Sequence, residues 1–91
     1  MFNAFTVVIQ GKVQGVGFRY FTKNKADELD LRGWVRNLPD GGVEVLAIGD
    51  KPLLEQFMQS LKAGPIGSRV ENTQFQWYSE TQELSRFEIR G

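Results

Sequence analysis

The order of strand-like and helix-like patterns is the feature that most constrains the fold of this chain. Phe5, Val7 and Ile9 alternate with their neighbours, which predicts a strand with one buried side. In residues 18–29 the apolar side chains of Phe18, Phe21, Ala26 and Leu29 recur at helical spacing, which predicts an amphipathic helix with these residues on one face. The remaining patterns predict strands at residues 32–37, 43–49, 69–78 and 87–90. They also predict a second helix that Asp50 caps and Gly64-Pro65 ends, with an apolar stripe made of Leu54, Phe57, Met58 and Leu61.

Turn signals indicate how these elements connect. Residues 39–42, Pro-Asp-Gly-Gly, separate two apolar runs, so the strands at 32–37 and 43–49 are predicted to form a hairpin. Two βαβ halves joined by a hairpin make an α+β, ferredoxin-like βαββαβ sandwich. We expect an antiparallel sheet with both helices on one face and a short extra strand at residues 87–90.

One of the predicted strands has an irregular pattern. Val70, Phe75 and Trp77 are the apolar candidates for the inner side of residues 69–78, but they do not keep one parity. An extra residue that shifts the register would reconcile them. We therefore predict a β-bulge near Asn72 or Thr73.

Composition bounds both the size of the protein and its chemistry. A chain of 91 residues with 41% hydrophobic residues can fill one core, so we expect a single domain over residues 1–91. The chain has no Cys and no His, which removes thiolate chemistry, disulfides and the commonest general base and metal ligand. Since the Asp and Glu residues are scattered as well, we expect no metal and no cofactor.

Charge and hydropathy indicate which partners to expect. Lys plus Arg equals Asp plus Glu, 11 of each, whereas nucleic-acid binders usually carry excess positive charge. No signal-peptide pattern is evident at the N-terminus, and no apolar run approaches the ~20 residues that cross a bilayer. We expect a cytoplasmic monomer that binds neither nucleic acid nor membrane.

Residues 11–19, Gly-Lys-Val-Gln-Gly-Val-Gly-Phe-Arg, lie between the first strand pattern and the first helix pattern. A glycine-rich turn that leads into a helix N-terminus favours anions, because unpaired N–H groups and the helix dipole both attract negative charge. Arg19 adds a planar cation that can bind two oxygens of one phosphate. The segment lacks the endings and spacings of a P-loop or a dinucleotide fingerprint. Its residues alone are as compatible with an ordinary turn followed by a solvated arginine as they are with a phosphate site.

A second segment, residues 33–43, favours the phosphate interpretation. Together the two segments resemble the two signature motifs of the acylphosphatase family, and the order and spacing of the elements also fit. The first motif is matched by Gly11, Val13-Gln14-Gly15-Val16 and Phe18-Arg19. The second is matched by Gly33-Trp34-Val35, Asn37, Gly41, Val43 and Gly49.

The resemblance implies an acylphosphatase, which hydrolyses acyl phosphates to a carboxylate and inorganic phosphate. It implies that Arg19 binds the phosphoryl group and that Asn37 orients the attacking water. It also implies a phosphate-binding loop made of Lys12, Val13, Gln14, Gly15, Val16, Gly17 and Phe18. Many family members carry a hydroxyl residue after the catalytic asparagine, and Leu38 stands there in this chain. The support of Asn37 by a neighbouring side chain therefore differs from the family pattern.

Two alternatives belong to other functional classes. Acylphosphatase-like domains also occur inside larger carbamoyl-transfer proteins, as accessory sites for carbamoyl phosphate. We expect a free-standing enzyme, with a small acyl phosphate as substrate and inorganic phosphate as product and competitive inhibitor. The other alternative is an RNA-binding RRM, because residues 15–21 resemble its aromatic motif. That motif belongs on the third strand, and residues 43–49 contain no aromatic side chain.

Overall fold

Strands and helices follow one another in the predicted order. The computed structural model describes residues 2–80 and 84–91. Its elements are β1 (Phe2–Lys12), α1 (Phe18–Glu28), β2 (Arg32–Asn37), β3 (Val43–Gly49), α2 (Lys51–Ala63), β4 (Arg69–Glu80) and β5 (Phe87–Arg90). The first and fourth strands extend further than expected, and α1 ends one residue earlier, with Leu29 at its C-cap.

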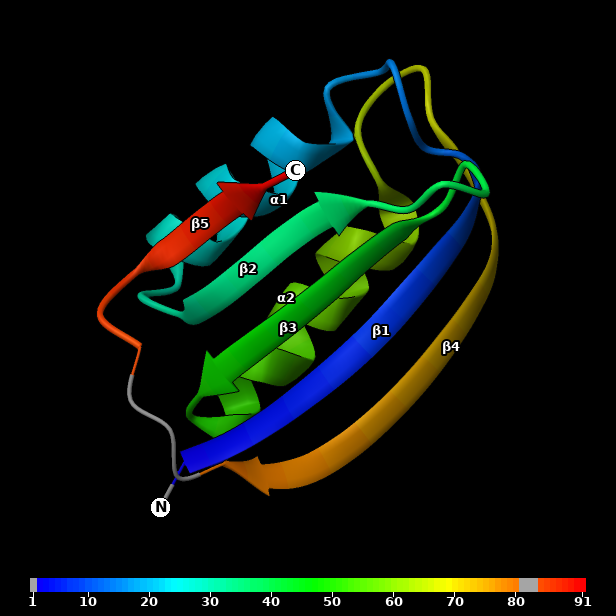
Figure 1. Cartoon of the computed structure of the whole chain (residues 1–91). Helices are drawn as coiled ribbons and strands as arrows, with labels where there is room; N and C mark the ends of the chain where they lie inside the picture. The colour runs from blue at the N-terminus through cyan, green and yellow to red at the C-terminus, as the bar shows by residue number, and fades with distance from the viewer. Residues whose placement is uncertain (1, 81–83) are drawn as a thin grey trace.

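The strands form one sheet in the order β4-β1-β3-β2-β5, and both helices cover the same face of it (Figure 1). β1 pairs antiparallel with β3 and β4, and β2 pairs antiparallel with β3. This confirms the ferredoxin-like sandwich. The short extra strand, β5, lies beside β2 in parallel, so the complete sheet is mixed.

The core lies between the sheet and the helices. The predicted stripe of α2, made of Leu54, Phe57, Met58 and Leu61, is buried along its whole length. The Phe57 ring contacts both Phe5 of β1 and Phe87 of β5, with ring centroids 6.1 and 5.9 Å apart. Full burial of each such side chain contributes about 1.5–3 kcal/mol. This helix therefore packs against the sheet and stabilises the core on the face that the helices cover.

The buried side of α1 differs from the prediction. Phe18 and Ala26 are buried as expected, whereas Phe21 and Leu29 are only half-buried and Thr22 is fully buried. A threonine is tolerated there because its hydroxyl donates a hydrogen bond of 2.8 Å to the carbonyl oxygen of Phe18, one turn earlier. Asp50 does occupy the N-cap of α2, but its side chain makes no capping hydrogen bond.

A β-bulge occurs in β4, one residue before the predicted positions. Gln10 faces Asn72 and Gly11 faces Val70, so Glu71 is the extra residue. The bulge lets Val70 pack against the core while Phe75 and Trp77 face the same side at the sheet edge. The register therefore shifts close to the point where β1 leads into the glycine-rich segment.

The other face of the sheet carries a small second cluster. Trp34 packs there against Ala4, Leu46 and Ile48, because its strand parity is opposite to that of Asn37. The guanidinium groups of Arg36 and Arg90 lie 5.3 and 5.5 Å from the Trp34 ring centroid. This cluster and the two arginines therefore shield part of this face from water.

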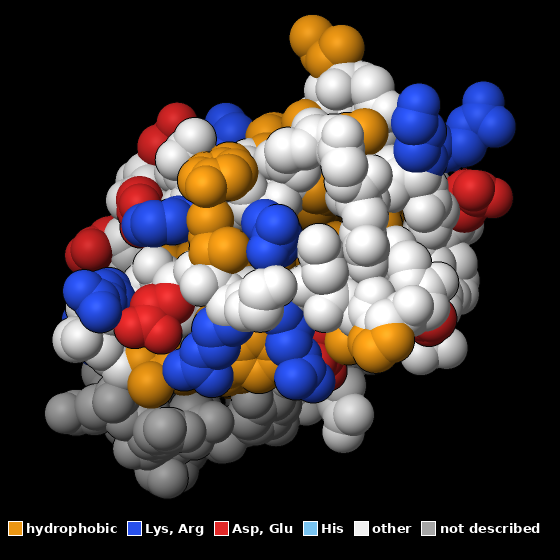
Figure 2. Space-filling view, turned by 45° about the horizontal axis from the view of Figure 1, so that its top comes forward, with side chains coloured by type: hydrophobic (Ala, Val, Ile, Leu, Met, Phe, Trp, Pro, Cys, Tyr) orange, Lys and Arg blue, Asp and Glu red, His pale blue; other side chains and the backbone are white. Residues whose placement is uncertain are grey.

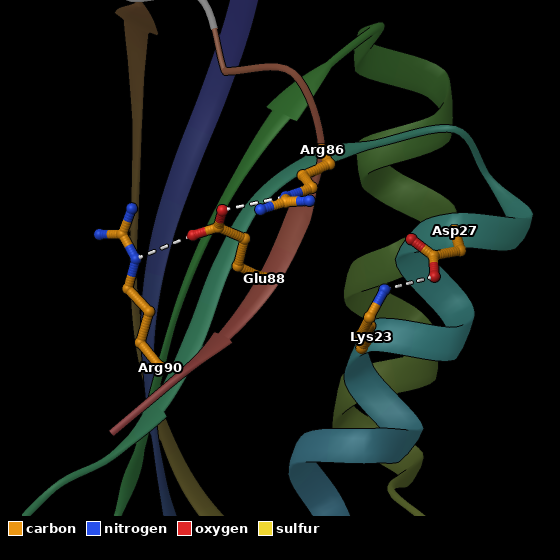
Figure 3. A network of polar contacts seen from close by, with 5 residues as sticks. All are labelled: Lys23, Asp27, Arg86, Glu88 and Arg90. Atoms are coloured by element: carbon orange, nitrogen blue, oxygen red, sulfur yellow. Dashed lines mark hydrogen bonds and ion pairs between the residues drawn. The ribbon is translucent and has the colours of Figure 1, made fainter.

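Surface ion pairs lie at β5 and on α1 (Figure 3). Glu88 accepts a hydrogen bond of 3.1 Å from Nε of Arg86 and lies 3.5 Å from Nε of Arg90. The hydrogen bond from Arg86, together with the charge of both arginines, lowers the pKa of the Glu88 carboxyl. Because these groups are exposed, the network contributes little to stability.

Candidate active site

A cavity of about 170 Å³ lies where the segment after β1 meets the end of β2. It is lined by Val13, Gln14, Gly15, Gly17, Phe18, Arg19, Tyr20 and Asn37. Figure 2 views the molecule with this end turned forward, where Lys and Arg side chains lie among apolar ones and acidic side chains lie mainly at the margins. The two segments singled out in the sequence therefore meet at one place.

Two glycines belong to the wall that Val13, Gln14, Gly15, Gly17 and Phe18 form. Gly15 and Gly17 have φ angles of 75° and 76°, in the left-handed region that glycine adopts without steric cost. Gly17 is the N-cap of α1, and its carbonyl oxygen accepts the hydrogen bond of the Phe21 N–H at 2.9 Å. The N–H groups of the first helical turn have no intrahelical acceptor, so this end of α1 can hold an anion.

Arg19 is the cation of the cavity. It lies in the first turn of α1 and is half-buried. Its Nη1 donates a hydrogen bond of 3.3 Å to the carbonyl oxygen of Gly91, just beyond β5. A cation at a helix N-terminus opposes the helix dipole, and a bound anion offsets that cost. The guanidinium is thus placed beside the wall that favours negative charge.

Asn37, the last residue of β2, brings an uncharged amide to the same cavity. It shares strand parity with Val35, which is buried on the helix side of the sheet, so Asn37 also faces that side. Its side chain is half-buried and makes no hydrogen bond within residues 2–80 and 84–91. The amide can therefore both donate to and accept from a ligand.

Gln14 connects the loop to the β2–β3 hairpin. Its Nε2 donates to the carbonyl oxygens of Leu38 and Gly42, both at 2.8 Å. These partners are 24 and 28 residues away along the chain. The contact joins the wall of the cavity to the strand end that carries Asn37.

The structure brings most of the predicted site residues together, with two exceptions. Val16 packs half-buried against the core, and its side chain does not line the cavity. Lys12 lines a different hollow, beside Gly67, Ser68 and Arg69. Tyr20, which is 68% exposed, borders the cavity. It was not predicted as a site residue, although its position directly after Arg19 in the sequence could have indicated it. The contact of Gly91 with Arg19 left no signal in the sequence.

Two further properties bear on the site and its surroundings. Over the described ranges, no helix is long and apolar enough to cross a membrane. The same ranges contain no group of three or more Asp or Glu side chains that could hold a metal ion together.

Comparisons with known proteins agree with the fold and the motifs. The family model described as Acylphosphatase matches residues 5–89. An acylphosphatase of Thermus thermophilus is 52% identical over 73 residues, which cover 80% of this chain and 83% of that protein. The crystal structure of an acylphosphatase from Bacillus subtilis superposes with a TM-score of 0.95 and 37% identity, covering 98% of this chain and 99% of the other. A crystal structure of full-length HypF superposes with a TM-score of 0.87 and 31% identity, covering 100% of this chain but 12% of that one.

The fold and the cavity define a class: small α+β domains in which a glycine-rich loop and one arginine line a cavity at the end of a sheet. Within that class, the family model spans nearly the whole chain, and the relatives match most of it. The chain belongs to the acylphosphatase family.

Proposed function

We propose that this chain hydrolyses acyl phosphates in the cavity shared by Arg19 and Asn37. The observation that carries the proposal is that α1 and β2 place these two side chains around one glycine-rich wall. Membership of the acylphosphatase family supports the same activity. Residues 13–18 and Arg19 hold the phosphoryl group in this proposal, and Asn37 orients the attacking water.

The reaction suits this small set of groups. The water oxygen bonds to phosphorus, the bond from phosphorus to the acyl oxygen breaks, and that oxygen leaves with its electron pair as a carboxylate. The proton of the water passes to the phosphate product. Because a carboxylate is a good leaving group, no general acid is needed, and phosphoryl transfer depends mainly on positioning and charge stabilisation. A chain without His or Cys can therefore carry it out.

Hydrolysis of benzoyl phosphate by the purified chain tests this proposal, with acetyl, carbamoyl and aspartyl phosphates as further substrates. We expect turnover that EDTA does not reduce and that inorganic phosphate inhibits competitively. Absence of turnover on every substrate would contradict the activity. Loss with EDTA and recovery with a divalent ion would contradict the metal-independent mechanism. A purely noncompetitive pattern would contradict the shared phosphate site.

An accessory role is the second candidate. The match to full-length HypF covers a small fraction of that protein, so domains with this fold also occur as parts of much longer chains. Efficient turnover by the isolated 91-residue chain favours a free-standing enzyme, and binding of carbamoyl phosphate without hydrolysis favours the accessory role. A single domain over residues 1–91, a monomeric state, a cytoplasmic location and the lack of nucleic-acid or membrane partners stay predictions.

A further inference from the structure

The side chain of Gln14, which lines the cavity, makes two hydrogen bonds to the β2–β3 hairpin. Both start at its Nε2, and they end at the carbonyl oxygens of Leu38 and Gly42, each at 2.8 Å. An amide nitrogen carries two hydrogens, so both are used. The side chain is partly buried at the boundary between the loop and the hairpin. The amide nitrogen of Gln14 thus faces the hairpin.

The hairpin holds these two carbonyl groups in place. The Leu38 N–H donates to the Gly42 carbonyl at 2.8 Å, and the Gly41 N–H donates to the Leu38 carbonyl at 3.2 Å. An oxygen of the Asp40 carboxylate accepts the Gly42 N–H at 2.9 Å. The turn is therefore closed by its own bonds, and Gln14 occupies the second acceptor position of each carbonyl oxygen.

The chemistry of the contact requires a donor. With the amide turned over, Oε1 of Gln14 would face two carbonyl oxygens, so only the orientation with Nε2 toward the hairpin is favourable. An ionised glutamate has the same shape but only accepts hydrogen bonds. It would therefore repel both carbonyl oxygens.

We propose that Gln14 is a positioning residue that locks the phosphate-binding loop to the strand end carrying Asn37. One of its acceptors belongs to Leu38, which directly follows Asn37 in the chain. The lock sets the spacing between the phosphoryl group in the loop and the water at Asn37, and it supports Asn37 through the backbone of Leu38. Reacting groups tolerate little displacement, since a misplacement of about 1 Å can cost about 10²-fold in rate. This role rests on the proposed function of the cavity.

The isosteric variant Gln14→Glu tests the lock. At neutral pH its carboxylate cannot donate, and we expect kcat to fall by about 10–100-fold, with a smaller change in the inhibition constant of phosphate. Glutamate titrates near pH 4.3 when unperturbed, and the facing carbonyl oxygens raise that pKa. As the pH falls, the protonated carboxyl regains one donor, so the activity of the variant should recover relative to the parent.

Two variants serve as controls. Gln14→Met removes the donor without adding a charge, so its activity should be low relative to the parent at every pH. Gln10→Glu makes the same chemical change at a half-buried position of β1 outside the cavity, and should keep parental kcat and pH dependence. Circular dichroism and thermal melting show whether each variant is folded. Should Gln14→Glu unfold at neutral pH, the kcat of Gln14→Met and the inhibition constant of phosphate decide the question.

The outcomes separate the lock from the reaction. If the wild-type chain is active and both Gln14 variants keep its kcat, the proposed lock is wrong. Identical pH dependence of the parent and Gln14→Glu would also overturn it. An inactive wild-type chain would overturn the proposed function instead. Hydrogen exchange at the backbone amides of Leu38, Asp40, Gly41 and Gly42 would then test the lock alone, with faster exchange expected in Gln14→Glu and equal exchange contradicting it.

Discussion

At the scale of single residues, Arg19 and Asn37 bring different properties to one cavity. Arg19 contributes a permanent charge with several donors in a plane, and Asn37 contributes a neutral amide that both donates and accepts. Within the described residues the Asn37 amide has no hydrogen-bond partner, whereas Arg19 contacts the Gly91 carbonyl. This difference predicts that the two substitutions will affect binding and turnover differently.

Replacing Arg19 should abolish most activity and weaken phosphate binding. Arg19→Ala removes the charge, and Arg19→Lys keeps it but loses the planar pair of donors, so lysine should restore little. We expect kcat/KM to fall by at least about 10²–10³-fold in both variants. Arg69→Lys, at an exposed position outside the cavity, is the matched control and should behave like the parent. Near-parental kinetics of Arg19→Lys would refute binding through two donors.

Replacing Asn37 should separate binding from turnover. The variant Asn37→Ala keeps the loop and Arg19 but loses the group that we propose orients the attacking water. Loss of one positioned polar contact in a transition state costs on the order of 2.7–4 kcal/mol, or roughly 10²–10³ in kcat. The inhibition constant of phosphate should stay close to that of the parent.

Steady-state kinetics with phosphate as inhibitor measure both quantities for Asn37→Ala, and thermal melting verifies the fold. Asn24→Ala, an exposed asparagine of α1, is the control and should leave kinetics unchanged. Retained kcat with lost phosphate affinity would reverse the two assigned roles. Retention of both would remove Asn37 from the site.

At the scale of elements, the position of Asn37 depends on close packing between β2 and β3. Gly33 of β2 has a φ angle of 140°, in the region that favours glycine. A Cβ atom at this position would overlap the carbonyl oxygen of Leu46 on β3. This gives a physical reason for the glycine in the second motif, since the two strands cannot pair this closely around a side chain.

Substitution of Gly33 should therefore destabilise the sheet. The backbone conformation alone costs Gly33→Ala about 1–3 kcal/mol of unfolding free energy, and the overlap with Leu46 adds to that. Gly67→Ala is the matched control, because its φ angle is also positive, at 92°, but nothing lies within 4 Å of the added carbon. Urea denaturation measures the free energy of unfolding of both variants. Equal losses in the two variants would show that the overlap has no energetic effect.

At the scale of the whole molecule, ligand binding is coupled to folding. The cavity is assembled from the loop after β1, the start of α1 and the end of β2, so it exists only in the folded state. Because the chain has a net charge of zero, any attraction of phosphate to the cavity depends on nearby groups and not on the electrostatic field of the whole protein. A ligand that binds only the folded state must raise stability, and the gain grows with the logarithm of its concentration above the Kd.

Inorganic phosphate should therefore stabilise the fold. At a concentration 100 times its Kd, the expected gain in unfolding free energy is about 2.7 kcal/mol. Thermal melting in phosphate and in chloride buffers of equal ionic strength measures the effect. The variant Arg19→Ala should show little of the gain at the same phosphate concentration. An equal gain in this variant would place the stabilising phosphate elsewhere on the protein.

Much of the fold follows from patterns that are local in the sequence. The α2 stripe from Leu54 to Leu61, the hairpin turn at residues 39–42 and the order of elements were all confirmed, because each depends on neighbouring residues. The errors have physical causes. The burial of Thr22 depends on a hydrogen bond to Phe18, and the place of the bulge depends on how β4 pairs with β1. Periodicity does not report either of these.

The sequence by itself determined the family and the residue types available for chemistry, since two motifs and the lack of His and Cys are properties of the chain alone. It also determined which positions can adopt left-handed backbone, such as Gly15 and Gly17. Only the tertiary structure decided which predicted residues share a cavity. Lys12 belongs to the predicted phosphate-binding loop but lies at another hollow, whereas Gln14 contacts the hairpin. The physical reason is that strand pairing and side-chain direction, and not distance along the chain, set which groups meet.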